Sequence, residues 1–153
     1  MRLIVFEPDI PQNLGTMLRL CACLGVAADV VEPCGFPFST PALRRAGMDY
    51  LDRVNVTRHA SWAAYRAQAG AGRLVLLTTK AERSYTAFDF AAHDRLVVGR
   101  ESAGAPDWLH AEADARVAIP LRPGFRSLNV AVAAAMVLGE ALRQTGQLPV
   151  PQQ

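Results

Sequence analysis

The sequence has few cysteines, no long apolar run and little net charge, and each shortage excludes a class of protein. Its three cysteines, Cys21, Cys23 and Cys34, have neither zinc-site nor disulfide-framework spacing, so we expect buried thiols in a reducing compartment. The four apolar residues before Glu7 are too few for a signal peptide. The apolar run at 130–139 is far below the ~20 residues that span a bilayer. We therefore expect a cytoplasmic protein without a membrane segment.

The composition is that of an ordinary globular protein. The chain has 153 residues, of which 51% are hydrophobic and 20% charged, and its net charge is +2. These values favour neither disorder nor strong attraction to polyanions, although a pI near 8.6 permits nucleic-acid binding. We expect a single domain over residues 1–148 and a disordered tail at 149–153.

Short apolar runs alternate with helix-like segments, which is typical of α/β proteins with a mostly parallel sheet. The apolar runs predict strands at residues 3–6, 28–31, 54–56, 74–77, 96–98 and 117–119. Helices are predicted at 14–24, 41–46 and 62–69, with a short turn at 106–109 and a final helix from about Leu128. We therefore expect one mostly parallel sheet flanked by helices.

Three connecting loops are dense in glycine, proline and hydrogen-bonding residues. They are EPDIPQNLG at 7–15, VGRESAGAP at 98–106 and IPLRPGFRSLN at 119–129, and each follows a predicted strand. Ligands of open α/β sheets bind beyond the carboxyl ends of the strands, so these loops could build one site. The alternative is that they contain only turn residues.

Common nucleotide, metal and hydrolase sites are disfavoured. The only GxG, at 70–72, precedes a strand instead of following one, which argues against a dinucleotide fold. Gly99 and Gly104 have phosphate-loop spacing, but Ala105 and Pro106 replace the lysine and hydroxyl that such a loop needs. The three histidines are scattered without metal-ligand spacing. A serine hydrolase built on Ser127 stays conceivable, yet no GxSxG elbow surrounds it.

The loops carry a resemblance to a known family. EPDIPQNLG, VGRESAG at 98–104 and the pair IP (119–120) and SLNV (127–130) resemble the three ordered motifs of the SPOUT RNA methyltransferases. Within that superfamily the chain resembles the TrmL-type tRNA 2′-O-methyltransferases, which modify the wobble nucleotide 34, a cytidine or modified uridine, in leucine tRNAs. Further matches are RLCACLG (19–25), EPCGF (32–36), LRRAGMDY (43–50), VTRH (56–59) and LTTK (77–80).

The resemblance implies a fold and a set of ligands that periodicity cannot reveal. It implies a deep trefoil knot in the C-terminal part of the sheet, a homodimer, and a tRNA substrate held at its anticodon stem-loop. It also implies S-adenosyl-L-methionine as methyl donor, giving S-adenosyl-L-homocysteine, with no metal. The cofactor-binding residues implied by position are Leu77, Thr78, Gly99, Glu101, Gly104, Ile119, Leu121, Ser127 and Leu128.

The resemblance also implies catalytic residues. Arg19 matches the arginine to which the family assigns activation of the ribose hydroxyl. A guanidinium is a poor base, so we expect Arg19 to orient a phosphate and stabilise the developing alkoxide, with a role as base left open. Asn13, Ser127 and Asn129 are the other candidates. Each could instead do no more than cap a helix, Asn13 the first, Ser127 and Asn129 the last.

Substrate RNA requires cations, and six side chains are candidates for phosphate contacts. They are Arg44, Arg45, Arg58, Lys80, Arg122 and Arg126, although for any one of them a solvated surface charge is the alternative. Two other functions stay open beside tRNA methylation. One is a noncatalytic RNA- or nucleotide-binding module, and the other is a methyltransferase of the same fold with a different RNA target.

The final helix points to a dimer on physical grounds alone. Residues 130–139 place no polar side chain on any face of the predicted helix, so the helix must be buried on all sides. One small sheet covers only one side. We expect a second subunit to cover another, with burial wholly inside one chain as the alternative.

Overall fold

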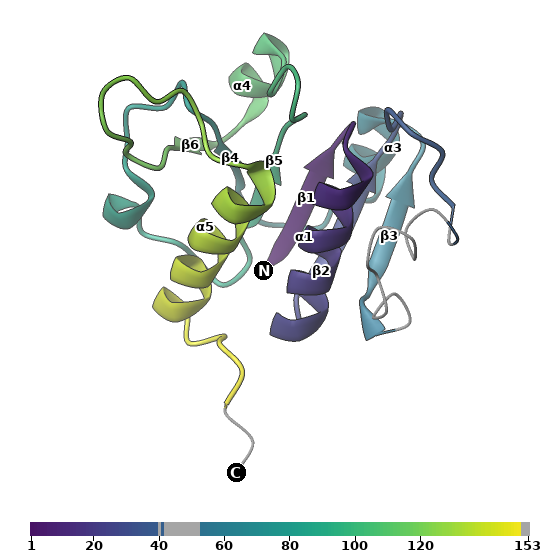
Figure 1. Cartoon of the computed structure of the whole chain (residues 1–153). Coiled ribbons are helices and arrows are strands. Elements are labelled where there is room, and N and C mark those ends of the chain that lie inside the picture. The colour runs from purple at the N-terminus through teal and green to yellow at the C-terminus, as the bar shows by residue number, and fades with distance from the viewer. Residues whose placement is uncertain (40, 42–52, 151–153) are drawn as a thin grey trace.

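The computed structural model describes residues 1–39, 41 and 53–150. Within them lies one six-stranded parallel sheet in the order β3-β2-β1-β5-β4-β6, with helices on both faces (Figure 1). The strands are β1 (Arg2–Phe6), β2 (Ala27–Val31), β3 (Val56–His59), β4 (Leu74–Leu77), β5 (Arg95–Val98) and β6 (Ala115–Val117). The helices are α1 (Pro11–Leu24), α3 (Trp62–Gln68), the 3-10 turn η2 (Tyr85–Ala87), α4 (Asp107–Glu112) and α5 (Val130–Gln144). The predicted single parallel sheet flanked by helices is confirmed.

The sheet separates two apolar cores. Alternate side chains of a strand point to opposite faces, so Leu3 and Val5 join one core while Ile4 and Phe6 join the other. The first core includes the buried faces of α1 and α5, which lie side by side in front of the sheet in Figure 1. The second core packs against α3 and α4. Burial on both faces explains why the central strands are mostly apolar. The exceptions are Arg2, Arg95 and Asp29, and the buried Asp29 carboxylate is hydrogen-bonded to Arg2 and His59.

The two long helices begin differently. α1 starts with Pro11 after Ile10, whose side chain makes no capping bond, so Asn13 lies inside the helix and its predicted role as a cap is wrong. α5 starts at Val130, two residues later than predicted. Asn129 precedes it and accepts hydrogen bonds from the backbone N–H groups of Ala131 and Val132, which confirms the capping role of Asn129.

Two predicted strands are displaced. The strand predicted at 54–56 occupies Val56–His59, because it is an edge strand of the sheet, where the polar side chains of Thr57 and Arg58 can face solvent. The strand predicted at 117–119 occupies Ala115–Val117. Beyond Val117 the chain leaves β4, and Ala118 instead donates its backbone N–H to Arg83.

Four further predictions concern the helix at 41–46, the C-terminal tail, the membrane segment and the knot. The predicted helix at 41–46 lies outside the described residues except for Pro41, as do Arg44 and Arg45. Of the predicted tail, the structure describes Pro149 and Val150, which are exposed. No helix in the described ranges is long and apolar enough to cross a membrane. The strand order does not test how the chain is threaded, so the knot stays a prediction.

The outer face of α5 is not buried within one chain. Ala134, Val137 and Leu138 are fully buried against the sheet, whereas Val132 is 51% exposed and Met136 39% exposed. The alternative, that this helix is buried wholly inside one chain, is therefore wrong, and cover by a second subunit stays a prediction. Val132 and Met136 therefore form an apolar strip on α5 that is exposed to solvent in the single chain.

Candidate functional site

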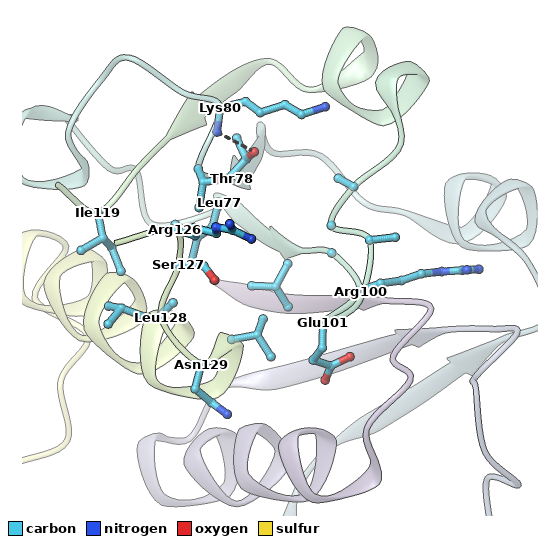
Figure 2. Close-up of a pocket in the computed structure, with 18 of the residues that line it drawn as sticks. Leu77, Thr78, Lys80, Arg100, Glu101, Ile119, Arg126, Ser127, Leu128 and Asn129 are labelled. Atoms are coloured by element: carbon cyan, nitrogen blue, oxygen red, sulfur yellow. Dashed lines mark hydrogen bonds between the residues drawn. The ribbon is translucent and has the colours of Figure 1, made fainter. Parts of the chain in front are cut away.

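A cavity of about 600 Å³ opens beyond the carboxyl ends of β4 and β5 (Figure 2). Its wall comes from the three loops that the sequence singled out, together with the segment after β4 and the first turns of α1 and α5. The lining residues are Ile10, Asn13, Leu77, Thr78, Thr79, Lys80, Val98, Gly99, Arg100, Glu101, Ala103, Gly104, Ala105, His110, Ile119, Leu121, Arg126, Ser127, Leu128, Asn129, Val130 and Ala133. The volume is in the range of small-molecule and cofactor sites.

All nine residues predicted to bind the cofactor line this one cavity. Several of them are apolar, so they can offer a ligand only packing surface and main-chain groups. Ile119, Leu121 and Leu128 make no backbone hydrogen bond to any other described residue, which leaves their N–H and C=O groups available. A wall of this kind suits a flat heterocycle with a polar edge, such as adenine.

Three of the four predicted catalytic residues also meet in the cavity. Asn13, Ser127 and Asn129 line it, and the side-chain amide of Asn129 donates to the Asn13 side-chain oxygen at 2.9 Å. Asn129 therefore caps α5 and also joins it to α1. Ser127 makes no capping bond to α5, so the alternative that it only caps this helix is wrong. Arg19 lies on an exposed face of α1 and does not line the cavity.

The loop after β5 is closed by its own backbone. Arg100 and Gly104 exchange N–H···O bonds of 3.3 and 2.9 Å, and Gly104 has the left-handed φ of +67° that this turn requires. A Cβ on Gly99 would lie 2.5 Å from the backbone nitrogen of Ala105. The two glycines are therefore needed for this loop to fold against itself, beyond any contact with a ligand.

Asp9 ties this loop to the loop after β1, and sequence reasoning missed it. Its carboxylate accepts the backbone N–H groups of Glu101 at 3.1 Å and Ser102 at 3.3 Å, and also the Ser102 hydroxyl. The Asp9 backbone N–H in turn donates to the Glu101 carboxylate at 3.0 Å. A second link is the ion pair between Arg100 and Glu7. No local pattern could reveal contacts between residues more than ninety positions apart.

The two carboxyl groups of this junction differ in acidity. Burial, and secondarily its hydrogen bond with Asp9, raises the pKa of Glu101. The hydrogen bond with Glu101 lowers the pKa of Asp9, helped by the donors on Ser102. The Oε1 atom of Glu101 is buried and has no hydrogen-bond partner among the described residues. Glu101 therefore lines the cavity with a carboxyl group that has one oxygen buried inside the protein.

The predicted phosphate-binding cations are divided by the structure. Lys80 and Arg126 line the cavity, and Arg122 is exposed in the loop that leads to Arg126. Arg58 lies elsewhere, paired with Glu32 at 2.7 Å and with its guanidinium 4.1 Å from the Phe38 ring centre. Among the described residues no group of three or more His, Cys, Asp or Glu side chains could hold a metal ion.

Sequence comparison finds close relatives of known activity. The tRNA (cytidine(34)-2′-O)-methyltransferase of Beijerinckia indica is 66% identical over 148 residues, which cover 95% of this chain and 92% of the relative. The protein of the same description from Escherichia coli K12 is 38% identical over 150 residues, covering 95% and 94%.

Solved structures of similar fold also include RNA methyltransferases. One, from a study of the 2-OH methylation of C/U34 on tRNA, has a TM-score of 0.87 and 36% identity, covering 94% of this chain and 89% of that one. The SpoU methyltransferase AviRb of Streptomyces viridochromogenes, in complex with AdoMet, has a TM-score of 0.82 and 27% identity, covering 94% and 60%.

The match to a family is nearly full length. The model of the SpoU rRNA Methylase family matches residues 1–139, which include every strand, α1 and the wall of the cavity. The resemblance to SPOUT methyltransferases is thereby confirmed, and the chain belongs to the SpoU rRNA Methylase family.

Proposed function

We propose that this protein is an S-adenosylmethionine-dependent tRNA 2′-O-ribose methyltransferase that acts on the wobble nucleotide 34. The observation that carries the proposal is the single cavity, which collects all nine predicted cofactor residues and three predicted catalytic residues. The proposal draws further support from relatives 66% and 38% identical that are described as tRNA (cytidine(34)-2′-O)-methyltransferases.

The residues present fit the methyl donor. Main-chain groups of Ile119, Leu121 and Leu128 would meet the adenine edge. The donor supplies a methyl group on a positively charged sulfur, already activated for transfer. The protein must then hold the ribose hydroxyl in line with that methyl group and help to remove its proton.

Asn13, Ser127 and Asn129 are placed to orient the ribose. They approach the cavity from α1 and from the segment before α5, and the hydrogen bond between the two asparagines fixes their side chains. Arg19 lies outside the cavity wall. It can stabilise a developing alkoxide if bound RNA spans both the cavity and α1, or if a second subunit brings the two together.

A second copy of the chain is the proposed cover for the exposed strip of α5. Val132 and Met136 are four residues apart on α5, and Leu128 precedes Val132 by the same spacing; these three side chains and Ile10 are large and exposed. Exposed apolar side chains at helical spacing are the surface that a subunit contact would cover. Sedimentation velocity should give a dimer, and a monomer at all accessible concentrations would contradict this part of the proposal.

We further propose leucine tRNAs as substrates, recognised through the anticodon stem-loop. The test is transfer of labelled methyl from S-adenosylmethionine to a panel of tRNAs, followed by alkaline hydrolysis, which spares the bond after a 2′-O-methylated ribose. Leucine tRNAs should become resistant after nucleotide 34. A matched leucine tRNA with 2′-deoxyribose at position 34 should accept no methyl group there.

The same experiment separates the remaining alternatives. A noncatalytic binding module would bind both S-adenosylmethionine and tRNA without incorporation into any RNA. Incorporation at another nucleotide, or into ribosomal RNA alone, would replace tRNA position 34 with a different target.

A further inference from the structure

The turn at 122–125 connects two residues that line the cavity. Leu121 and Arg126, the residues on either side of it, both line the cavity. The Phe125 backbone N–H donates to the carbonyl of Arg122 at 3.3 Å, with Pro123 second in the turn and Gly124 third at a φ of +91°. Proline followed by a glycine of positive φ is the sequence of a type II turn. The direction of the Phe125 side chain is therefore set by a short, stiff turn.

Phe125 is exposed in a way that the other phenylalanines are not. Its exposed fraction is 72%, while Phe6, Phe88 and Phe90 are all buried in the two cores. The ring gains little apolar burial within the chain. A rigid aromatic ring beside a cavity is a preformed surface on which a flat partner can stack, at a low entropic cost.

The charges around Phe125 favour a polyanion. Arg122 and Arg126 flank it, and neither forms an ion pair with any described residue. No aspartate or glutamate occurs between residues 115 and 139. Figure 2 shows Arg126 beside Leu77 and Ser127 at the cavity, with Lys80 above it in the view. An aromatic ring between cations is the arrangement that binds single-stranded nucleic acid, the ring taking a base and the cations taking phosphates.

We propose that Phe125 stacks on an unpaired nucleobase of the RNA loop at the cavity, while Arg122 and Arg126 contact the phosphates on either side. The ribose of the target nucleotide must enter the cavity, so the stacked base is that of the target or of its immediate neighbour. The inference rests on the proposed function and deepens it, because it names a residue that holds the substrate. The other possible occupant, a second copy of this chain, is less favoured because the segment offers no carboxylate to offset its arginines.

Binding of a labelled anticodon stem-loop RNA, measured by fluorescence anisotropy, tests the stack. Phe125→Ala should weaken binding about 5- to 150-fold, the effect expected from loss of one stacked base. Phe125→Leu keeps most of the apolar area but removes the ring, so it should weaken binding as Ala does, whereas Phe125→Trp should restore it. Val150→Ala, at a side chain that is 85% exposed in the C-terminal segment, is the matched control and should change nothing.

Salt dependence separates the ring from the cations. The slope of log Kd against log salt concentration should fall by about 0.7 for Arg122→Gln, which removes one phosphate contact to a single strand. Phe125→Ala should leave that slope unchanged. Affinity for S-adenosylhomocysteine and the unfolding temperature should stay at wild-type values in both variants, because neither side chain lines the cavity or the cores.

Each outcome has one meaning. Wild-type affinity in Phe125→Leu, or a loss of less than twofold in Phe125→Ala, overturns the stacking proposal. The stacking proposal is also overturned if the Phe125 variants dissociate from dimer to monomer in sedimentation and recover RNA binding at high protein concentration. If the wild type binds the RNA with this pattern of variants but methylates none, stacking stands and the proposed function fails. If the wild type methylates tRNA while the Phe125 variants bind RNA with wild-type affinity, the proposed function stands and the stacking proposal fails.

Discussion

Asn129 caps α5 and also donates a hydrogen bond to Asn13 in α1, and its replacement tests both interactions. Asn129→Ala removes the cap of α5, worth about 1 kcal/mol of the free energy of unfolding, because the N–H groups of Ala131 and Val132 lose their acceptor. It also removes the hydrogen bond to Asn13, worth about 1 kcal/mol more. The sum, about 2 kcal/mol, corresponds to a fall of roughly 4–8 °C in Tm for a chain of this length.

Asn129→Ser is the matched variant, since serine caps a helix but is too short to reach α1. Its free energy of unfolding should fall by only about 1 kcal/mol. The double-mutant cycle of Asn13→Ala with Asn129→Ala should give a coupling energy of about 1 kcal/mol, which assigns the contact between the helices directly. Unfolding is followed in urea at one fixed protein concentration, because association would otherwise change the apparent stability.

Methyl-transfer kinetics then test whether the contact between Asn129 and Asn13 contributes to catalysis. If the asparagine pair orients the ribose, Asn129→Ser should lower kcat by about 10²-fold although the protein stays folded, because misplacement of the reacting groups by about 1 Å costs that much. Wild-type kcat in Asn129→Ser would reduce Asn129 to a helix cap. Equal stability losses in the serine and alanine variants would refute the separation of cap and contact.

Three further perturbations have defined outcomes. Gly99→Ala should lower Tm and weaken S-adenosylhomocysteine binding together, because the added Cβ meets backbone of the same loop at 2.5 Å; calorimetry measures both, and loss of neither would contradict the packing. The expectation of buried thiols is wrong for Cys23, which is exposed. In the native protein a thiol reagent at pH 8 should label Cys23 but not Cys21, whose pKa burial raises to about 12; peptide masses after proteolysis identify the labelled sites. Asp9 has a lowered pKa, chiefly through its hydrogen bond with Glu101, so it stabilises the fold above its unfolded-state pKa of about 4, and this contribution is lost as pH falls. In Asp9→Asn the free energy of unfolding should fall less steeply as pH drops below about 4 than in the wild type, and an unchanged pH dependence would refute this.

Elements with strong local signals could be predicted from the sequence. The central strands are buried on both faces and are therefore mostly apolar, so their predicted ranges fall within one residue of β1, β2, β4 and β5. Edge strands lack that signal. β3 carries polar Thr57 and Arg58, and β6 is only three residues long, so both were displaced by about two residues.

The candidate site was predicted in composition but not in arrangement. The motifs identified the cavity residues, because the resemblance supplied positions that burial patterns do not mark. Asp9 was missed because its partners lie in another loop more than ninety positions away, and Arg19 was placed with the site although it lies outside the cavity wall. Long-range contacts and the direction of a helix face depend on how elements pack, and one sequence holds no direct record of that.

The position of β1 bears on how the protein is made. β1 precedes the other strands of the sheet in chain order and lies in its middle, with β2 on one side and β5 on the other. β5 follows about ninety residues later, which at roughly 5–20 residues per second means a delay of several seconds. During that time β1 has an open hydrogen-bonding edge of apolar sequence, the kind of surface that invites aggregation. Completion of the sheet in the nascent chain therefore waits for the synthesis of β5.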